Sequence, residues 1–138
     1  MKQVAVIPYK RDAMGEIEVL LVTSRETGRW VIPKGWRMKG LPDHKAAAEE
    51  ALQEAGVKGR VDREPVGGYH YFKRFRYKFE LVEVSVFLLE VDKQLSSWSE
   101  EAQRKRCWFS IADAKRMVDE PGLMSLLATL ASHIGRDR

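Results

Sequence analysis

Two glutamates, four residues apart, are the residues of this 138-residue chain whose type and spacing best suit catalysis. Glu50 and Glu54 lie in the segment DHKAAAEEALQEA, which we expect to be helical. Residues four apart on a helix share a face, with Cβ atoms roughly 5–6 Å apart. Two carboxylates held this close repel each other unless a cation lies between them. Such oxygen ligands suit Mg²⁺ or Mn²⁺, and Mg²⁺ sites commonly include substrate phosphates, so the pair predicts metal-dependent phosphate chemistry.

The helix that must position these glutamates has start and stop signals on both sides. Pro42 or Asp43 is a suitable first residue or cap, and Gly56 is a natural stop just past the last turn. The expected buried face, which would pack closely on a sheet, consists of Ala48, Ala51, Leu52 and Ala55. The glutamates would then look into a cleft. A solvated acidic face is the alternative that the helix alone leaves open.

The rest of the chain predicts a mixed α+β protein, a sheet covered by helices. Alternating or continuous apolar runs predict strands at 4–7, 17–22, 30–32, 61–68, 69–75, 78–91 and 106–109. Pro8 should end the first strand, and the chain should turn as a hairpin near 74–77. Helices are expected at 111–118 and 123–134, and residues 34–41 should form a loop. No linker or repeat interrupts the sequence, so we expect one domain over residues 1–138.

Composition fits a soluble protein that binds an anion. The net charge is +4, 32% of residues are charged, and no apolar run approaches the roughly 20 residues of a membrane span. The start MKQVAVIPYK is too short and too quickly charged for a signal peptide. Cys107 has no partner for a disulfide, and its neighbours Trp108 and Phe109 predict a buried apolar role for it. We therefore expect a cytoplasmic location.

The segment from Gly35 to Val57 resembles the Nudix box, G-x5-E-x7-R-E-U-x-E-E-x-G-U, in which U is aliphatic. Gly35, Glu50, Glu54 and the Gly56-Val57 pair match the pattern. The departures from the pattern are Leu41 in place of Glu, Glu49 in place of Arg, Gln53 in place of Glu, and Ala51 as a minimal U.

The resemblance extends beyond the box. RWVIPKGW before the helix, EAGVKGRV at its end and RCWFSIADAKRMV later look like the diphosphoinositol polyphosphate and diadenosine polyphosphate hydrolase branch. It implies the Nudix fold, an α/β/α sandwich around a mixed β-sheet. It also implies hydrolysis of a phosphoanhydride with Mg²⁺ or Mn²⁺ as cofactor.

By this resemblance, the catalytic residues are Glu50, Glu54 and Gln53, with Glu50 also a candidate base. The metal ligands would be Glu50, Glu54 and the Gly35 carbonyl, together with Gln53 and Glu49. Because an amide carries no charge, Gln53 should weaken metal binding, and Glu49, one turn earlier, is a hypothetical source of the missing charge. Four glutamates outside the helix are candidates for further metal ligands: Glu80, Glu83, Glu100 and Glu101.

Basic side chains near these segments are the candidates for binding substrate phosphates. They are Arg25, Lys34, Arg37, Lys73, Arg74, Arg76 and Arg104. The stretch 70–78 interleaves aromatic and basic residues, a pattern that can stack a base and bind its phosphates. An ordinary amphipathic hairpin with solvated cations is the alternative there.

These observations predict a pyrophosphohydrolase acting on an anionic phosphorylated small molecule, such as a nucleoside diphosphate derivative, a dinucleoside polyphosphate or a diphosphoinositol polyphosphate. Sanitation of an oxidised nucleoside triphosphate and removal of pyrophosphate from an RNA 5′ end are alternatives within the same fold. A different class is a catalytically weakened module that only binds nucleotides or polyphosphates. We expect no membrane partner, no nucleic acid apart from that RNA 5′ end, and a monomer or homodimer.

Overall fold

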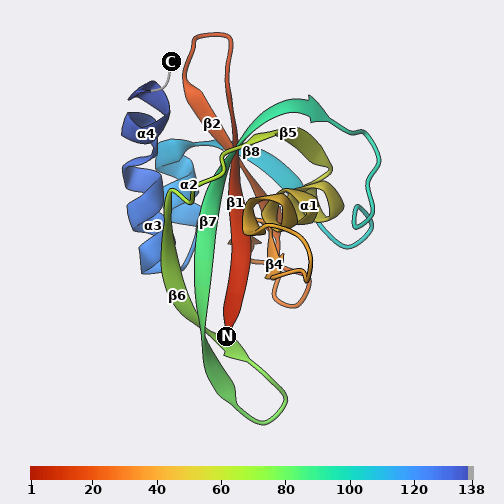
Figure 1. Cartoon of the computed structure of the whole chain (residues 1–138). Helices are drawn as coiled ribbons and strands as arrows, with labels where there is room; N and C mark the ends of the chain where they lie inside the picture. Colours follow the sequence, from red (N-terminus) through yellow and green to blue (C-terminus); the bar gives the residue numbers. More distant parts are fainter. Residues whose placement is uncertain (137–138) are drawn as a thin grey trace.

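A mixed sheet lies at the centre of the computed structural model, which describes residues 1–136 (Figure 1). Its eight strands are β1 (Lys2–Arg11), β2 (Ile17–Thr23), β3 (Trp30–Val31), β4 (Lys34–Trp36), β5 (Val57–Val61), β6 (Gly67–Arg74), β7 (Phe79–Gln94) and β8 (Arg106–Ser110). The main order is β3-β2-β1-β7-β5, while β4 pairs with β1, β6 with β7, and β8 with β2. Among the strand pairs of the described residues, only β1–β7 is parallel.

Strand β1 continues through Pro8 and does not end there as the sequence suggests. One edge of β1 pairs with β7 from Lys2 to Tyr9. The other edge pairs with β4 at Gln3–Ala5 and with β2 at Tyr9–Arg11. Pro8 falls between these two stretches, so its missing N–H breaks neither antiparallel ladder.

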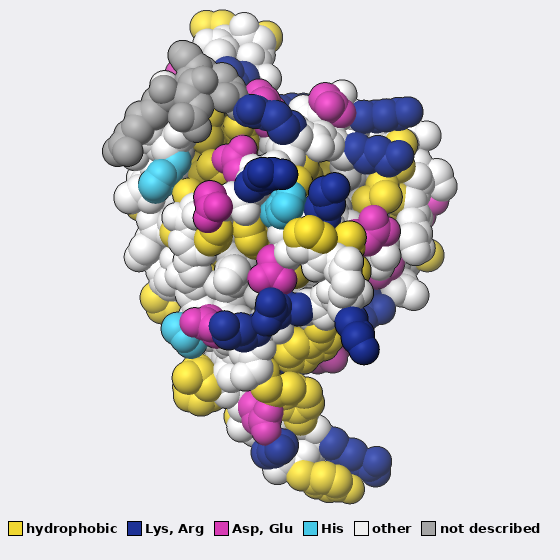
Figure 2. All heavy atoms as spheres, viewed as in Figure 1, with side chains coloured by type: hydrophobic (Ala, Val, Ile, Leu, Met, Phe, Trp, Pro, Cys, Tyr) yellow, Lys and Arg dark blue, Asp and Glu magenta, His cyan; other side chains and the backbone are white. Residues whose placement is uncertain are grey.

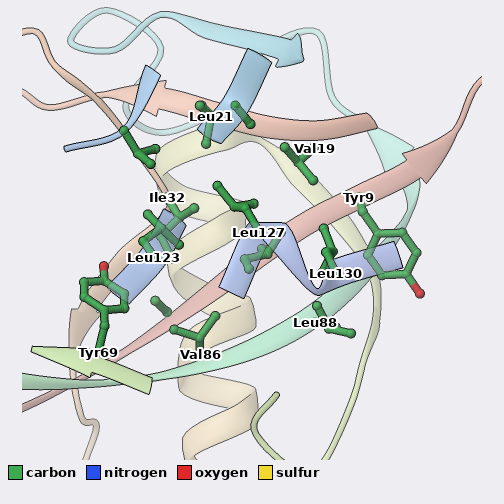
Figure 3. Packing of buried hydrophobic residues seen from close by; sticks show 14 of the residues in the cluster. Tyr9, Val19, Leu21, Ile32, Tyr69, Val86, Leu88, Leu123, Leu127 and Leu130 are labelled. Atoms are coloured by element: carbon green, nitrogen blue, oxygen red, sulfur yellow. The ribbon is translucent and has the colours of Figure 1, made fainter. Parts of the chain in front are cut away.

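Helices cover both faces of the sheet, which confirms the predicted α/β/α sandwich (Figure 1). Helix α1 (Asp43–Ala55) lies on one face, and α2 (Ile111–Met117), α3 (Pro121–Ala128) and α4 (Leu130–Arg136) lie on the other. Alternate residues of β1 serve the two cores, since Val4 and Val6 pack towards α1 while Ala5 and Ile7 pack towards the other three helices. Figure 3 shows the second core, in which Leu123, Leu127 and Leu130 meet the sheet.

Several element boundaries differ from the sequence prediction. The single strand expected at 61–68 is wrong, because residues 62–66 form a loop between β5, which ends at Val61, and β6, which begins at Gly67. Strand β5 begins at Val57, where the chain leaves α1 through the left-handed Gly56. The expected loop at 34–41 contains the short β4. The terminal helix is two helices divided at Thr129, although the buried leucines continue in step across the break.

Cys107 corrects a further prediction, because this cysteine is exposed rather than buried. Within residues 1–136, no helix combines the length and the apolar character that crossing a membrane requires.

Candidate active site

The carboxylate of Glu50, on α1, lies directly over Gly35, on β4. This contact joins the helix to the strand. A Cβ atom at position 35 would overlap all three carboxyl atoms of Glu50, so only glycine leaves room for this approach. The Oε2 atom of Glu50 is buried and has no hydrogen-bond partner among the described residues. Burial, followed by the charge of Glu100, raises the pKa of Glu50. The site thus holds an acidic oxygen that lacks a protein donor.

Glu54, also on α1, is buried where the helix meets β4, with 6% of its surface exposed. Its Oε1 atom accepts a long hydrogen bond from the backbone N–H of Lys34 at 3.4 Å and lies 3.7 Å from Nη2 of Arg104. Burial raises the pKa of Glu54 to about 7; Arg104 and Lys34 oppose this effect, while Glu50 and Glu100 add to it. Two carboxyl groups of one helix are therefore held in a region largely shielded from water, where the nearby cations Arg104 and Lys34 offset only part of the effect of burial on Glu54.

The predicted buried face of α1 is partly wrong. The buried residues of this helix are Ala46, Ala47, Ala51, Glu54 and Ala55. Ala48 and Leu52 are only half-buried. The helix is thus rotated so that Glu54 faces β4, and the alanines allow the close approach that brings its carboxylate there.

The loop between β7 and β8 brings a third carboxylate, Glu100, to the site. Arg104, whose side chain is 9% exposed, donates from Nε to Glu100 Oε1 at 2.7 Å and from Nη1 to the Thr23 carbonyl at 3.0 Å. Arg25 Nε lies 3.9 Å from the same Glu100 oxygen. Arg104 therefore links the end of β2, the loop and Glu54.

Glu100 is the only one of the four outside glutamates that the structure brings to the helix carboxylates, among the residues it describes. Glu80 and Glu83 pair with Lys78 and Lys2, on the β6–β7 hairpin and at the start of β1. Glu101 accepts a hydrogen bond from Ser97 within its own loop.

Two residues fix this loop to the end of α1: Trp98, which no sequence pattern indicated, and Arg106, whose basic run 104–106 suggested a polyphosphate contact instead. Trp98 donates from Nε1 to the carbonyl of Glu54 at 3.0 Å. Arg106 donates to the carbonyls of Ala55 at 2.8 Å and Leu95 at 2.6 Å, and its guanidinium lies 3.7 Å from the centre of the Trp98 ring. Both side chains pack against Gly56, where a Cβ would lie 2.8 Å from Trp98. No local pattern links these positions.

The predicted phosphate-binding cations lie in different places. Three of them, Arg25, Lys34 and Arg104, lie beside the carboxylates of Glu50, Glu54 and Glu100, which together form the acid cluster. The charge of Lys73 acts on Lys34 from nearby. Arg37 pairs with Asp43 at 3.0 Å, at the start of α1.

Arg74 and Arg76 belong to the β6–β7 hairpin, which projects away from α1 (Figure 1). The structure therefore does not bring these two arginines to the acid cluster.

Gln53 and Glu49 form a pair of their own on α1. Gln53 Nε2 donates to Glu49 Oε1 at 3.2 Å, and both side chains are half-buried. The backbone carbonyl of Gln53 accepts the N–H of Glu100 at 3.0 Å, which ties the loop to this turn of the helix.

The donor set fits a hard divalent cation bound jointly by protein, water and substrate. In the part of the chain that is described, no three His, Cys, Asp or Glu residues converge closely enough to hold an ion by themselves. Mg²⁺ is usually held by one or two carboxylates together with waters and substrate phosphates, so a full protein cage is not required. The buried, unpartnered oxygen of Glu50 is an available ligand of the right kind.

Comparison with known proteins identifies the family. The NUDIX domain profile matches residues 1–129. The chain belongs to the Nudix family. Nudix hydrolase 13, mitochondrial, of Arabidopsis thaliana is 30% identical over 126 residues, which cover 84% of this chain and 60% of that relative. Diphosphoinositol polyphosphate phosphohydrolase 3-alpha of Mus musculus is 35% identical over 120 residues, which cover 85% of this chain and 68% of the mouse protein.

Solved structures agree on the Nudix fold. A C. elegans Ap4A hydrolase in a binary complex superposes with a TM-score of 0.72 at 22% identity, covering 97% of each chain. A second structure of C. elegans Ap4A hydrolase has a TM-score of 0.68 at 25% identity and covers 96% of this chain and 97% of the other. Relatives from both parts of the branch suggested by the sequence are thus found. The chain spans only 60% of the length of the Arabidopsis relative.

Proposed function

We propose that this Nudix protein is a Mg²⁺- or Mn²⁺-dependent pyrophosphohydrolase of multiply phosphorylated small molecules. The substrate would be a dinucleoside polyphosphate or a diphosphoinositol polyphosphate, the classes named for the C. elegans and mouse proteins. The observation that carries the proposal is the buried, unpartnered oxygen of Glu50, placed over Gly35 and close to Glu54. A cytoplasmic location and a monomeric or homodimeric state stay predictions.

In this proposal, the cation would be held by Glu50, Glu54 and the Gly35 carbonyl. Gln53 and Glu49, on a neighbouring side of α1, would be weaker additional ligands. When bound, such an ion activates water and neutralises charge on the phosphates. Glu50 is the candidate acceptor for the proton of the attacking water. The Lys34 N–H orients Glu54, and Arg104 orients Glu100.

Arg25 and Lys34 are the candidates for phosphate contacts beside this centre. The side chain of Arg25 is 57% exposed and has only a 3.9 Å ion pair and a 3.4 Å hydrogen bond to the β7–β8 loop, so it can turn towards a substrate. Arg104 is fixed by three protein groups and is better suited to positioning than to binding.

The test is a screen of phosphoanhydride substrates with Mg²⁺ and Mn²⁺. The panel contains dinucleoside polyphosphates, diphosphoinositol polyphosphates, nucleoside triphosphates including oxidised ones, and nucleotide sugars. We expect metal-dependent product release, lowered at least about 100-fold by Glu50→Gln. Thermal stabilisation by a ligand, without release of any product, would instead identify a binding module.

The same screen with Gln53→Glu tests the hypothesis about the neutral ligand. A carboxylate at position 53 would face Glu49 and should repel it when no metal is present, at a cost of about 0.2–0.5 kcal/mol. We expect a lower melting temperature in chelator and a larger stabilisation by Mn²⁺ than in the parent. An unchanged response to Mn²⁺ would show that Gln53 does not limit metal binding.

A further inference from the structure

The β6–β7 hairpin carries an exposed apolar patch on a part of the sheet that α1 does not cover. Phe72 is 68% exposed, Leu81 50% and Phe79 65%. In the register of the hairpin, Phe72 stands opposite Leu81, and Arg74 stands opposite Phe79. These side chains therefore lie together on one face of the ribbon. Contiguous exposed apolar surface of this kind usually marks an interaction site.

Basic side chains surround this patch. Arg74 shares this face, Arg76 and Lys78 lie in the turn of the hairpin, and among these three only Lys78 has a carboxylate partner within the described residues, Glu80 at 2.7 Å. The guanidinium of Arg76 lies 5.3 Å from the ring centre of Tyr77, which is 87% exposed. Figure 2 shows apolar and basic side chains side by side on the projection that this hairpin forms.

The positive charge of the hairpin indicates which kind of partner could bind this patch. Symmetric pairing with a second copy would bring two sets of unpaired arginines together, and like charges facing each other across an interface are unfavourable. An anionic partner would be attracted to the same arginines. The partner should therefore be both apolar in part and negatively charged.

The two phenylalanines offer neighbouring stacking surfaces. Phe72 and Phe79 occupy diagonal positions across the hairpin, which are about 7–8 Å apart along the backbone of an antiparallel pair. Both rings are exposed, at 68% and 65%, so each presents a surface on which a base can stack. We propose that this face of the β6–β7 hairpin binds single-stranded nucleic acid, with bases stacked on Phe72 and Phe79 and phosphates on Arg74 and Arg76.

The same face leads along β7 to a hollow with one further cation, Arg63. Beyond Glu83, whose charge is balanced by Lys2 at 3.6 Å, Ser85 and Phe87 line this hollow of about 360 Å³ together with Arg63 and the Arg37–Asp43 ion pair. At about 3.3 Å per strand residue, Phe79 and Phe87 are roughly 26 Å apart along β7. An oligonucleotide of several residues could follow this path, so affinity should rise with its length.

A direct test is fluorescence anisotropy with a 3′-labelled A12 RNA and the matching A12 DNA. Both carry a 5′ hydroxyl and are used in chelator, so neither contains a hydrolysable phosphoanhydride. We expect Phe72→Ala/Phe79→Ala to weaken binding at least about tenfold, since each stacked base contributes substantially. The control Met14→Ala removes another exposed apolar side chain, in the β1–β2 turn, and should leave the affinity unchanged.

The salt dependence tests the arginines. Each lost phosphate contact lowers the slope of log affinity against log salt by about 0.7, so Arg74→Gln/Arg76→Gln should lower it by about 1.4. The matched control is Lys58→Gln/Lys93→Gln, two exposed cations that face each other in the β5–β7 pair and whose loss changes the net charge equally. This control should retain the slope.

Three results would overturn the proposal. The first is no binding of either oligonucleotide at about 100 µM protein and low salt, where even non-specific binding is normally detected. The second is an equal loss in the two double cation variants, which would reduce the effect to net charge. The third is a dimer in sedimentation that Phe72→Ala/Phe79→Ala dissociates, which would assign the patch to a second copy. Because the probes hold no phosphoanhydride, failure of the substrate screen would not affect this result.

Discussion

The contact between Glu50 and Gly35 makes a backbone position part of the candidate centre. Since a methyl group at position 35 would overlap the Glu50 carboxylate, Gly35→Ala must move that side chain or separate α1 from β4. We expect Mn²⁺ affinity, measured by calorimetry, to fall at least about tenfold while the circular dichroism spectrum stays native. The tenfold figure corresponds to about 1.4 kcal/mol, a modest displacement of one ligand.

A suitable control for this variant is Gly135→Ala, because a Cβ atom there would meet nothing within 4 Å. It should leave metal affinity unchanged. Equal Mn²⁺ affinity in Gly35→Ala and the parent would show that Glu50 does not bind the ion from its present position.

Glu54 makes the stability of the metal-free protein depend on pH. Its pKa is about 7 in the folded protein and near 4.5 when exposed, so the folded state binds more protons between these values. The stability of the metal-free fold is therefore highest below pH 4.5, as far as Glu54 is concerned, and is lost as pH rises through 7. The change is roughly 3 kcal/mol at most.

Denaturant titrations in chelator between pH 4.5 and 8 measure this effect. Glu54→Gln should remove most of the decline, because the neutral amide has no charge to bury. Glu64→Gln, at an exposed position, should keep the parental profile. A parental stability that does not decrease over this range would contradict the burial of an ionised Glu54.

At the scale of elements, Arg106 is one of several groups that attach the β7–β8 loop to α1, together with the Trp98 side chain and the Glu100 N–H. Arg106→Met removes two hydrogen bonds to backbone carbonyls and the contact with Trp98. We expect a loss of about 2–4 kcal/mol in the free energy of unfolding. Lys105→Met, at an exposed neighbouring position, should cost little.

Hydrogen exchange localises the effect of this substitution. The amides of Leu95 and Glu100 donate to the carbonyls of Gly56 and Gln53, and both should exchange faster in Arg106→Met. If only global stability falls and these two amides keep their relative protection, the loop is held by other contacts.

The elements with local signals were predictable from the sequence. Helix α1 begins at Asp43 and ends before Gly56 as expected, because a proline and a left-handed glycine act on the backbone where they stand. The break at Thr129 was not predictable, since no glycine or proline marks it and the apolar spacing continues through it. The predicted end of the first strand at Pro8 was wrong, because the effect of a proline in a strand depends on whether a neighbouring strand needs its N–H. That pairing is not visible in the local sequence.

Among the acidic residues of the candidate site, only those within the Nudix box could be singled out from the sequence. Glu50 and Glu54 follow from helical spacing, whereas Glu100 reaches them through a loop whose path is fixed by Trp98 and Arg106. Selecting Glu100 from four glutamates requires those tertiary contacts. The burial of Glu54 likewise depends on how α1 is rotated on the sheet, which alanines on several faces do not determine.

At the scale of the whole molecule, the two cores contribute differently to stability and to metal binding. The core under α2, α3 and α4 contains none of the candidate metal ligands, whereas in the core under α1 the helix contributes alanines, beside the carboxylates, that pack on larger apolar residues of the sheet. Stability should therefore be separable from metal binding by substitutions on opposite faces of the sheet.

Leu127→Ala and Ala51→Leu test this separation, because both positions are fully buried. Leu127→Ala leaves a cavity against the sheet and should cost about 2–5 kcal/mol of stability, with Mn²⁺ affinity unchanged at a temperature where the protein stays folded. Ala51→Leu should cost about 1–3 kcal/mol and also weaken Mn²⁺ binding, since the larger side chain pushes α1, and with it Glu50 and Glu54, away from β4. Parallel losses of Mn²⁺ affinity in the two variants would show that the layers are coupled and that the centre depends on the whole sandwich.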